Sequence, residues 1–247
     1  MDIIPSALTR HEKIALNFSG GKDSLACVHL LREHLDRITI YHVDTGDKLP
    51  EQQESVARVE AFAPHFVRIQ MDVRGWIAAN GLPTDLMPHN SHVIGRLLRE
   101  DNGPRLVPRY DCCYANIMLP AIRRAVEDGN TLIIRGTKTA DIPRLPWKSG
   151  DIDPASGLEL YLPLRDWSDA DVFAFLRSEG VEISRFYQEG LKGAPDCAHC
   201  SAWWDEGRGP YLKKYHPEVF AEYERRLCVI AAELGGPLTH LHRELSV

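Results

Sequence analysis

The sequence lacks the features that mark three large classes of protein. None of its apolar runs is longer than a strand, so it offers no segment for crossing a membrane and predicts no membrane partner. Its first residues contain no basic stretch followed by an apolar core, so we expect no secretory signal and a cytoplasmic location. Its formal charge is −6 at pH 7, whereas proteins that coat nucleic acids are usually basic.

The composition is otherwise that of an ordinary globular protein. The 247 residues are 44% hydrophobic and 26% charged, which suits one large domain or one domain with an appendage. The charge is uneven, because residues 95–148 hold ten Lys and Arg against six Asp and Glu. Such a basic stretch fits a small anionic ligand, one end of a nucleic acid, or an ordinary mixed surface.

Short apolar segments rich in β-branched residues alternate with amphipathic segments. The expected strands are residues 13–18, 37–43, 65–73, 131–137 and 158–164. The expected helices are residues 23–35, 50–63, 113–128, 168–179 and 215–233, and Ser168 with Asp171 makes a capping-box-like start for the fourth. This alternation predicts an α/β fold, a doubly wound and mostly parallel five-stranded sheet with helices on both faces.

We expect two parts in the chain. Residues 1–184 are predicted to form the α/β domain, and residues 74–110, rich in Pro and Gly, look like an insertion that covers a site. Residues 185–247 are predicted to be an extension, bearing a pair of cysteines, that packs back on the same domain.

Residues 19–24, Ser-Gly-Gly-Lys-Asp-Ser, form a glycine-rich turn between the first expected strand and helix. The turn is not a Walker A loop, because Leu16 stands where that pattern needs a glycine and Asp23 where it needs a hydroxyl. The context is still that of a phosphate loop. Backbone N–H groups at Gly20 and Gly21 and the start of the helix can face an anion.

The loop resembles the fingerprint of the PP-loop ATP pyrophosphatases, which cut ATP between the α and β phosphates and leave an adenylated substrate. The resemblance implies that Ser19, Gly20, Gly21, Lys22 and Ser24 hold the nucleotide. It also implies that Asp23 and, in the motif Asp44-Thr45-Gly46, Asp44 contact Mg²⁺, with Lys22, Asp23 and Asp44 as the catalytic residues.

Two further stretches resemble the phosphoadenosine phosphosulfate (PAPS) reductase family. One matches a Pro-Leu-x-x-Trp-Ser/Thr-x-x-Asp-Val pattern at Pro163, Leu164, Trp167, Ser168, Asp171 and Val172. The other lies where that family has a basic loop at a strand end. There the resemblance implies that Arg135, Gly136, Lys138 and Arg144 bind phosphate or sulfate groups.

Four of the six cysteines form a pair of pairs: Cys112, Cys113, Cys197 and Cys200. In a chain without a secretory signal, clustered cysteines suggest a metal or redox site rather than disulfides. The pattern resembles the adenylyl-sulfate (APS) reductase branch, in which such cysteines bind a [4Fe–4S] cluster. Zinc and unliganded thiols remain alternatives. His199, between two of the cysteines, is expected at an exposed tip.

The chain departs from the reductases in two places. Asn116 and Ile117 stand where the reductases have Arg-Lys, so one basic contact is missing. The reductases also carry a Glu-Cys-Gly-Leu-His motif whose cysteine attacks the sulfur of the sulfonucleotide, and this sequence has no such motif. Cys228 lies in a helical apolar pattern and is expected to be buried in the core.

Three functions remain open. The preferred hypothesis is an iron–sulfur enzyme that binds an adenine nucleotide, most simply ATP, and performs adenylation-linked sulfur transfer. Its partners would be a nucleic-acid or small-molecule acceptor and a sulfur donor protein. The second hypothesis is a thiol-dependent APS or PAPS reductase that releases sulfite. The third is a metal-stapled nucleotide-binding partner protein without activity.

Overall fold

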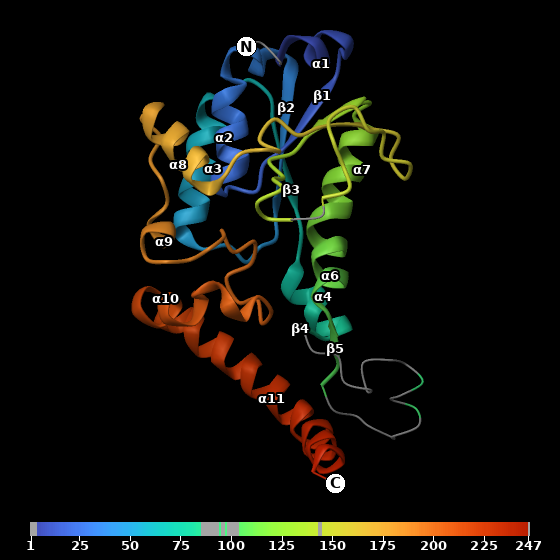
Figure 1. Cartoon of the computed structure of the whole chain (residues 1–247), viewed down its shortest axis with the longest axis vertical. Coiled ribbons are helices and arrows are strands. Elements are labelled where there is room, and N and C mark those ends of the chain that lie inside the picture. The colour runs from blue at the N-terminus through green and yellow to red at the C-terminus, as the bar shows by residue number, and fades with distance from the viewer. Residues whose placement is uncertain (1–3, 85–93, 95–96, 98–103, 143–144, 247) are drawn as a thin grey trace.

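The computed structural model describes residues 4–84, 94, 97, 104–142 and 145–246. Within these residues, a five-stranded sheet has the order β3-β2-β1-β6-β7, and every adjacent pair is parallel (Figure 1). Its strands are β1 (Ile14–Asn17), β2 (Ile38–Asp44), β3 (Phe66–Gln70), β6 (Leu132–Ile134) and β7 (Glu159–Tyr161). The predicted α/β fold with a parallel five-stranded sheet is thus confirmed.

Helices cover both faces of the sheet. On one side lie α2 (Lys22–Leu30), α3 (Pro50–Phe62) and α8 (Asp169–Ser178), and on the other lies α7 (Leu119–Glu127) (Figure 1). Successive strand residues point to opposite faces, so Ile14 and Leu16 pack with the first group of helices. Ala15 packs on the other face with Ala125 of α7. Burial on both faces explains why the strands are almost wholly apolar.

The remaining elements are shorter or lie outside the sheet. They are α1 (Ile4–Arg10), η1 (Arg32–Arg37), α4 (Val73–Asn80), α6 (Arg109–Cys113), η3 (Tyr114–Met118), α9 (Arg185–Gln188), η4 (Trp204–Glu206), α10 (Arg208–Tyr215) and α11 (Pro217–Leu245). The π-helical η3 joins α6 to α7, so these three form one continuous run.

The strand order places a ligand site at the carboxyl ends of β1 and β6. The chain runs from β1 outward through β2 to β3, and then returns to the other side of β1 for β6 and β7. The loops that leave β1 and β6 therefore diverge in opposite directions. Open parallel sheets bind ligands in the crevice that such a reversal creates.

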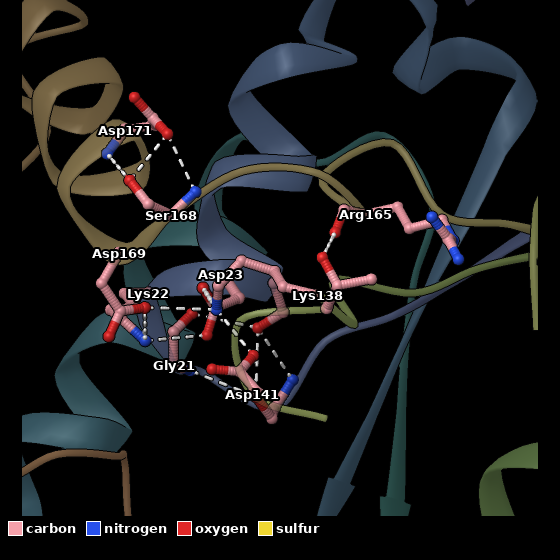
Figure 2. A network of polar contacts seen from close by, with 12 residues as sticks. Gly21, Lys22, Asp23, Lys138, Asp141, Arg165, Ser168, Asp169 and Asp171 are labelled. Carbon is pink, nitrogen blue, oxygen red and sulfur yellow. Dashed lines mark hydrogen bonds and ion pairs between the residues drawn. The ribbon is translucent and has the colours of Figure 1, made fainter. Parts of the chain in front are cut away.

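The beginning of α8 is fixed by a capping box, as its sequence predicts. The Ser168 hydroxyl accepts from the Asp171 N–H at 3.2 Å, and the Asp171 carboxylate accepts from the Ser168 N–H at 2.8 Å. This defined start holds Asp169, the first residue of α8, toward the loop after β1 (Figure 2).

The C-terminal residues pack around an apolar cluster distinct from that of the sheet. Its buried members are Leu49, Phe186, Leu191, Ala198, Tyr211, Leu212 and Tyr223. The central part of the expected insertion 74–110 lies outside the described residues. Its described ends form α4 and a small parallel sheet of β4 (Leu82–Thr84) and β5 (Leu106–Pro108). No helix among the described residues is both long and apolar enough to cross a membrane.

Candidate active site

A cavity of about 400 Å³ lies at the carboxyl ends of β1 and β6. Five of the predicted site residues line it: Ser19, Asp23, Ser24, Arg135 and Gly136. The remaining lining residues include Asn17, Lys48, Thr137 and Asp141, which sequence reasoning did not single out. The predicted phosphate loop and the predicted basic loop are therefore brought to one cavity.

Two glycines make this meeting of loops possible. Gly20 has φ +88°, a left-handed conformation that L side chains rarely adopt. A Cβ on Gly136 would lie 2.8 Å from the backbone carbon of Asp23 and 3.0 Å from the Ser24 nitrogen. The loop after β6 thus rests directly on the phosphate loop, which no larger residue at position 136 would allow.

Two lysines of the site are neutralised by three aspartates (Figure 2). Lys138 Nζ lies 2.6 Å from Asp23 Oδ1, 2.7 Å from Asp141 Oδ2 and 3.3 Å from Asp169 Oδ1. Lys22 Nζ lies 3.0 Å from Asp23 Oδ2 and 3.1 Å from Asp169 Oδ1. Neither lysine lines the cavity. Their predicted roles as phosphate ligands stay predictions, and in this arrangement both ammonium groups are occupied.

The pairing outweighs the cost of burying these charges. Burial alone would lower the pKa of Lys22 and of Lys138, but the neighbouring carboxylates raise both above the ordinary value. Burial would raise the pKa of Asp169, whereas Lys22 and Lys138 lower it. All three groups are therefore charged at neutral pH.

Arg135 is the cationic residue of the predicted basic loop that lacks such compensation. Its Nε is buried without a hydrogen-bond partner among the described residues, and so is Asn17 Oδ1 in the same cavity. Burial lowers the pKa of Arg135, and the charge of Asp153 offsets this in part. A guanidinium stays protonated under such conditions, so the cavity holds a desolvated positive charge suited to an anion. Arg144, the last predicted basic residue, lies outside the described residues.

Asp44 and Gly46 lie at the end of β2, beside the cavity. The Asp44 carboxylate accepts from the Gly46 N–H at 3.0 Å and from Arg68 at 3.2 Å. Burial would raise the pKa of Asp44, but these two donors lower it. Asp44 itself does not line the cavity, so its contact with Mg²⁺ stays a prediction.

The four paired cysteines meet at a second cavity, of about 190 Å³. Cys112 and Cys113 come from the end of α6, and Cys197 and Cys200 from the segment between α9 and α10. Among the described residues, no three His, Cys, Asp or Glu side chains are grouped so as to hold a single metal ion. The thiols thus line the wall of a cavity that could hold a larger group.

Burial disfavours the charged form of three of these thiols. It raises the pKa of Cys112 and Cys113 to about 12, with a smaller contribution from the charge of Cys200, and it raises the pKa of Cys197 well above the ordinary value. Asn116 donates to the Cys112 carbonyl oxygen at 2.9 Å, and its amide lies 3.7 Å from Cys112 Sγ. Asn116 therefore supports this end of α6 without supplying charge.

Two buried arginines line the cysteine cavity. Arg208 and Arg226 are 3% and 6% exposed, and they come from α10 and α11. Arg226 donates to the His199 carbonyl oxygen at 2.7 Å, and Arg208 to that of Cys200 at 3.1 Å. Both guanidinium groups therefore tie the C-terminal helices to the second cysteine pair. The basic stretch noticed in the sequence, 95–148, contains neither of them.

His199 is buried, not at the exposed tip that we expected. Its ring Nδ1 pairs with Asp47 Oδ1, and Arg74 pairs with the same oxygen at 3.0 Å. Burial would raise the pKa of Asp47, but His199 and Arg74 lower it to about 2. The Ala198 N–H donates to the Asp47 carbonyl oxygen at 2.6 Å. The loop after β2 and the second cysteine pair are thereby held together.

Cys228 is exposed, which corrects the expectation that it is buried in the core. It lies on α11, two residues after Arg226. Two residues turn a helix by about 200°, so Cys228 faces away from the cavity that Arg226 enters. The buried face of this part of α11 is formed instead by Tyr223 and Ile230.

The two cavities adjoin. Ile117 and Asp196 line both of them, and Ile117 stands where the reductases have a lysine. The boundary between the two cavities therefore has the apolar side chain of Ile117 in place of a lysine. Lys48 is a lining residue that the sequence motifs did not indicate: its side chain is 3% exposed, and its Nζ lies 3.9 Å from Asp196 Oδ1. Its position two residues after Gly46 is the signal that could have indicated it.

Comparisons with known proteins agree with this architecture. Residues 13–91 match the phosphoadenosine phosphosulfate reductase domain. The chain is 23% identical to an adenosine 5'-phosphosulfate reductase of Burkholderia cepacia, over 81% of this chain and 78% of that one. It is also 23% identical to an uncharacterized 37.8 kDa protein of Escherichia phage 186, over 87% and 72% of the two chains.

A solved structure, the phosphate complex of phosphoadenylyl-sulfate reductase from Candida auris, has the same fold. It matches with a TM-score of 0.54 at 17% identity, over 77% of this chain and 84% of that one. Residues 13–91 thus resemble the phosphoadenosine phosphosulfate reductase domain, and the chain is similar in sequence to APS reductases and in fold to a PAPS reductase.

Proposed function

We propose that the protein is an enzyme that binds a sulfonucleotide of the APS or PAPS class and reduces it to sulfite. The observation that carries this proposal is Arg135, whose Nε is buried without a hydrogen-bond partner among the described residues, in the same cavity as the phosphate-loop serines. The adjoining cysteine cavity supplies the second half of the site. The names of the relatives support reduction rather than the ATP-dependent sulfur transfer that we preferred from the sequence.

The nucleotide cavity offers donors to a small anion. Ser19 and Ser24 provide hydroxyl groups, and Arg135 provides a fixed positive charge. Lys48 provides a second positive charge, which is paired with Asp196 at 3.9 Å. Such donors stabilise both a bound phosphate–sulfate group and the negative charge that the leaving AMP acquires. The occupied state of Lys22 and Lys138 argues against a site that must also neutralise two further phosphates.

We propose a [4Fe–4S] cluster in the cysteine cavity, held by Cys112, Cys113, Cys197 and Cys200. Four thiolates are the donor set that such a cluster needs, and thiols spread around a cavity suit a cubane better than one zinc ion. Cluster and ligands together are anionic, and two buried arginines lie beside them, of which Arg226 also pairs with Glu222 at 2.7 Å and Arg208 with Glu206 at 3.9 Å. The cluster would link the two cysteine pairs and place its charge beside the sulfonucleotide.

The reaction needs two electrons, which we assign to two thiols from outside the chain. One thiolate attacks the sulfate sulfur, the S–O bond breaks, AMP leaves, and a thiosulfonate forms. A second thiolate attacks the thiol sulfur of this intermediate, which releases sulfite and leaves a disulfide. Within the chain Cys228 is exposed and faces away from the cavity, so it does not suit the first attack.

A second candidate is ATP cleavage between the α and β phosphates, followed by sulfur transfer to an acceptor. The observation that favours it is the intact Ser-Gly-Gly-Lys-Asp-Ser loop at residues 19–24. In that case Asp23 and Asp44 would contact Mg²⁺, a sulfur donor protein would be needed, and the acceptor would be a nucleic acid or a small molecule.

The two reactions differ in their products. Anaerobically purified protein is incubated with APS or PAPS and a dithiol, and separately with ATP and Mg²⁺. We expect sulfite and AMP, or adenosine 3',5'-bisphosphate from PAPS, and no pyrophosphate. Pyrophosphate without sulfite would replace this proposal with the second candidate. Nucleotide binding without either product would favour a partner protein that has no activity.

A further inference from the structure

The outer face of the phosphate loop is covered by α9 and the segment that follows it. The Tyr187 hydroxyl accepts from the Lys22 N–H at 2.9 Å. A Cβ on Gly21 would lie 3.1 Å from the Ala194 Cβ and 3.3 Å from the Tyr187 hydroxyl oxygen. The cavity therefore opens on the edge of the loop formed by Ser19, Asp23 and Ser24, whereas Tyr187 closes the other edge.

The N–H groups that a glycine-rich loop usually directs at phosphate are already engaged. The Ser19 N–H donates to Ser24 Oγ at 3.2 Å, and the Gly21 N–H donates to Ser19 Oγ at 3.3 Å. With the Lys22 N–H bonded to Tyr187, three donors of the turn, those of Ser19, Gly21 and Lys22, have partners within the protein. Only the Tyr187 contact comes from a distant segment, 165 residues along the chain.

The ammonium group of Lys22 also has partners within the protein. Lys22 Nζ lies 5.9 Å from the ring centroid of Phe173 and 5.6 Å from that of Tyr187, and Asp23 and Asp169 neutralise it. Tyr187 thus covers both the backbone donor and the side-chain charge of residue 22.

We propose that Tyr187 determines nucleotide specificity, because its hydroxyl oxygen occupies the place of a phosphate oxygen on the Lys22 N–H. A nucleotide whose 5' anion ends after one phosphate and a sulfate uses the open edge of the loop. A nucleotide with β and γ phosphates has to displace Tyr187. This inference deepens the proposed function and rests on it, since it explains how a loop of the ATP-using type serves a sulfonucleotide.

Packing holds Tyr187 in place. Its ring meets Phe173 edge-on at 5.5 Å and Phe186 at 4.6 Å between centroids, and Phe186 is fully buried. Burial raises the pKa of Tyr187, so the hydroxyl stays neutral and accepts the hydrogen bond without adding charge. Displacing this side chain would expose an apolar cluster, which makes entry of a longer phosphate chain costly.

The test compares AMP, ADP and ATP binding by calorimetry in the whole protein and in two variants. We expect the wild type to bind AMP at least as tightly as ATP. Tyr187→Ala opens the loop and is expected to bind ATP about tenfold or more tighter, with AMP and ADP, which is as long as APS, within about twofold. Tyr187→Phe frees the Lys22 N–H but keeps the ring, so about a threefold gain is expected. If Tyr187→Ala does not fold, the ratio of ATP to AMP affinity in Tyr187→Phe tests the inference.

Tyr215→Phe and Tyr215→Ala are the matched controls, because the Tyr215 hydroxyl bonds to Glu189 on the outside of the same region. They should leave the ATP to AMP affinity ratio unchanged. Unchanged ratios in both Tyr187 variants would overturn the inference, even if the protein releases sulfite from APS. A changed ratio without sulfite release would support the inference and overturn the proposed reaction. Tight ATP binding by the wild type would overturn the inference directly.

Discussion

The two cavities differ in how their charged groups are paired. Around the phosphate loop, Lys22 and Lys138 share three aspartates, and the Lys22 N–H is bonded to Tyr187. Around the cysteines, the two buried arginines are likewise paired with Glu222 and Glu206, whereas burial raises the pKa of three of the four thiols. A group with internal partners serves the fold, whereas a desolvated group without them is maintained for a ligand.

Arg135 is the exception that makes the comparison informative. It belongs to the phosphate side, yet its Nε is buried and unpartnered among the described residues. The proposed ligand-binding groups of this cavity are therefore distinguished by lack of a direct partner, not by charge alone. Four predictions test this distinction.

The largest effect is expected for the cysteine cavity. Cys200→Ala removes one of four proposed ligands, and we expect bound iron and sulfide to fall at least about tenfold. Metal and sulfide analysis of anaerobically purified protein measures this. Cys228→Ala is the control, since Cys228 is exposed and faces elsewhere. Undiminished iron in Cys200→Ala would mean that the ligand set is wrong.

Arg135→Met should separate binding from stability. We expect AMP and APS to bind about 10- to 100-fold more weakly, because charge-assisted hydrogen bonds to the anion are lost. The melting temperature of the ligand-free protein should not fall, since the substitution removes a partly buried charge whose Nε has no hydrogen-bond partner among the described residues. Arg123→Met, on the exposed side of α7, is the control. A stability loss with unchanged affinity would place Arg135 among the structural residues.

Lys138→Met should lower the stability of the ligand-free protein and leave the affinity for AMP almost unchanged. It leaves Asp23, Asp141 and Asp169 close together without their shared cation, which we expect to cost about 2–3 kcal/mol in the free energy of unfolding. AMP affinity should change less than about threefold. Urea unfolding and calorimetry measure the two quantities, with the exposed Lys148→Met as control. A large loss of affinity at full stability would show that Lys138 leaves its aspartates to bind the nucleotide.

The smallest effect concerns the link between the two regions. The pKa of Asp47 is lowered to about 2, so its carboxylate contributes stability above the unfolded value near 4. That contribution, about 2 kcal/mol, is lost as the pH falls from 4 through 2. Asp47→Asn should therefore be less stable at pH 7 and flatter across this acid range. Asp44→Asn, whose partner Arg68 is more exposed, should behave nearly as the wild type does.

Much of the fold was predictable because it depends on local patterns. All five strands were found from β-branched apolar runs, and the capping box at Ser168 was found from two residues three apart. The parallel arrangement followed because alternating strands and helices leave few other ways to cover a sheet. The expected strand 65–73 proved shorter, since Asp72 caps α4 and ends the extended chain.

The errors concern side chains whose surroundings come from distant segments. His199 is buried because Asp47 and Arg74, more than 100 residues away, surround its ring. Cys228 is exposed because α11 turns its other face, with Arg226, toward the cysteine cavity. A residue's own neighbours in sequence do not report such contacts.

The sequence by itself determined the parallel α/β fold, the phosphate loop and the resemblance to the reductase family, because periodicity and motifs are local properties. Only the tertiary structure decided which cations are free. Lys22, Lys138 and Arg135 look alike in the sequence, but the loops place carboxylates directly on the first two, whereas Arg135 Nε has no hydrogen-bond partner among the described residues. Burial and charge pairing depend on what the whole chain brings together, and these decide which groups can bind a ligand.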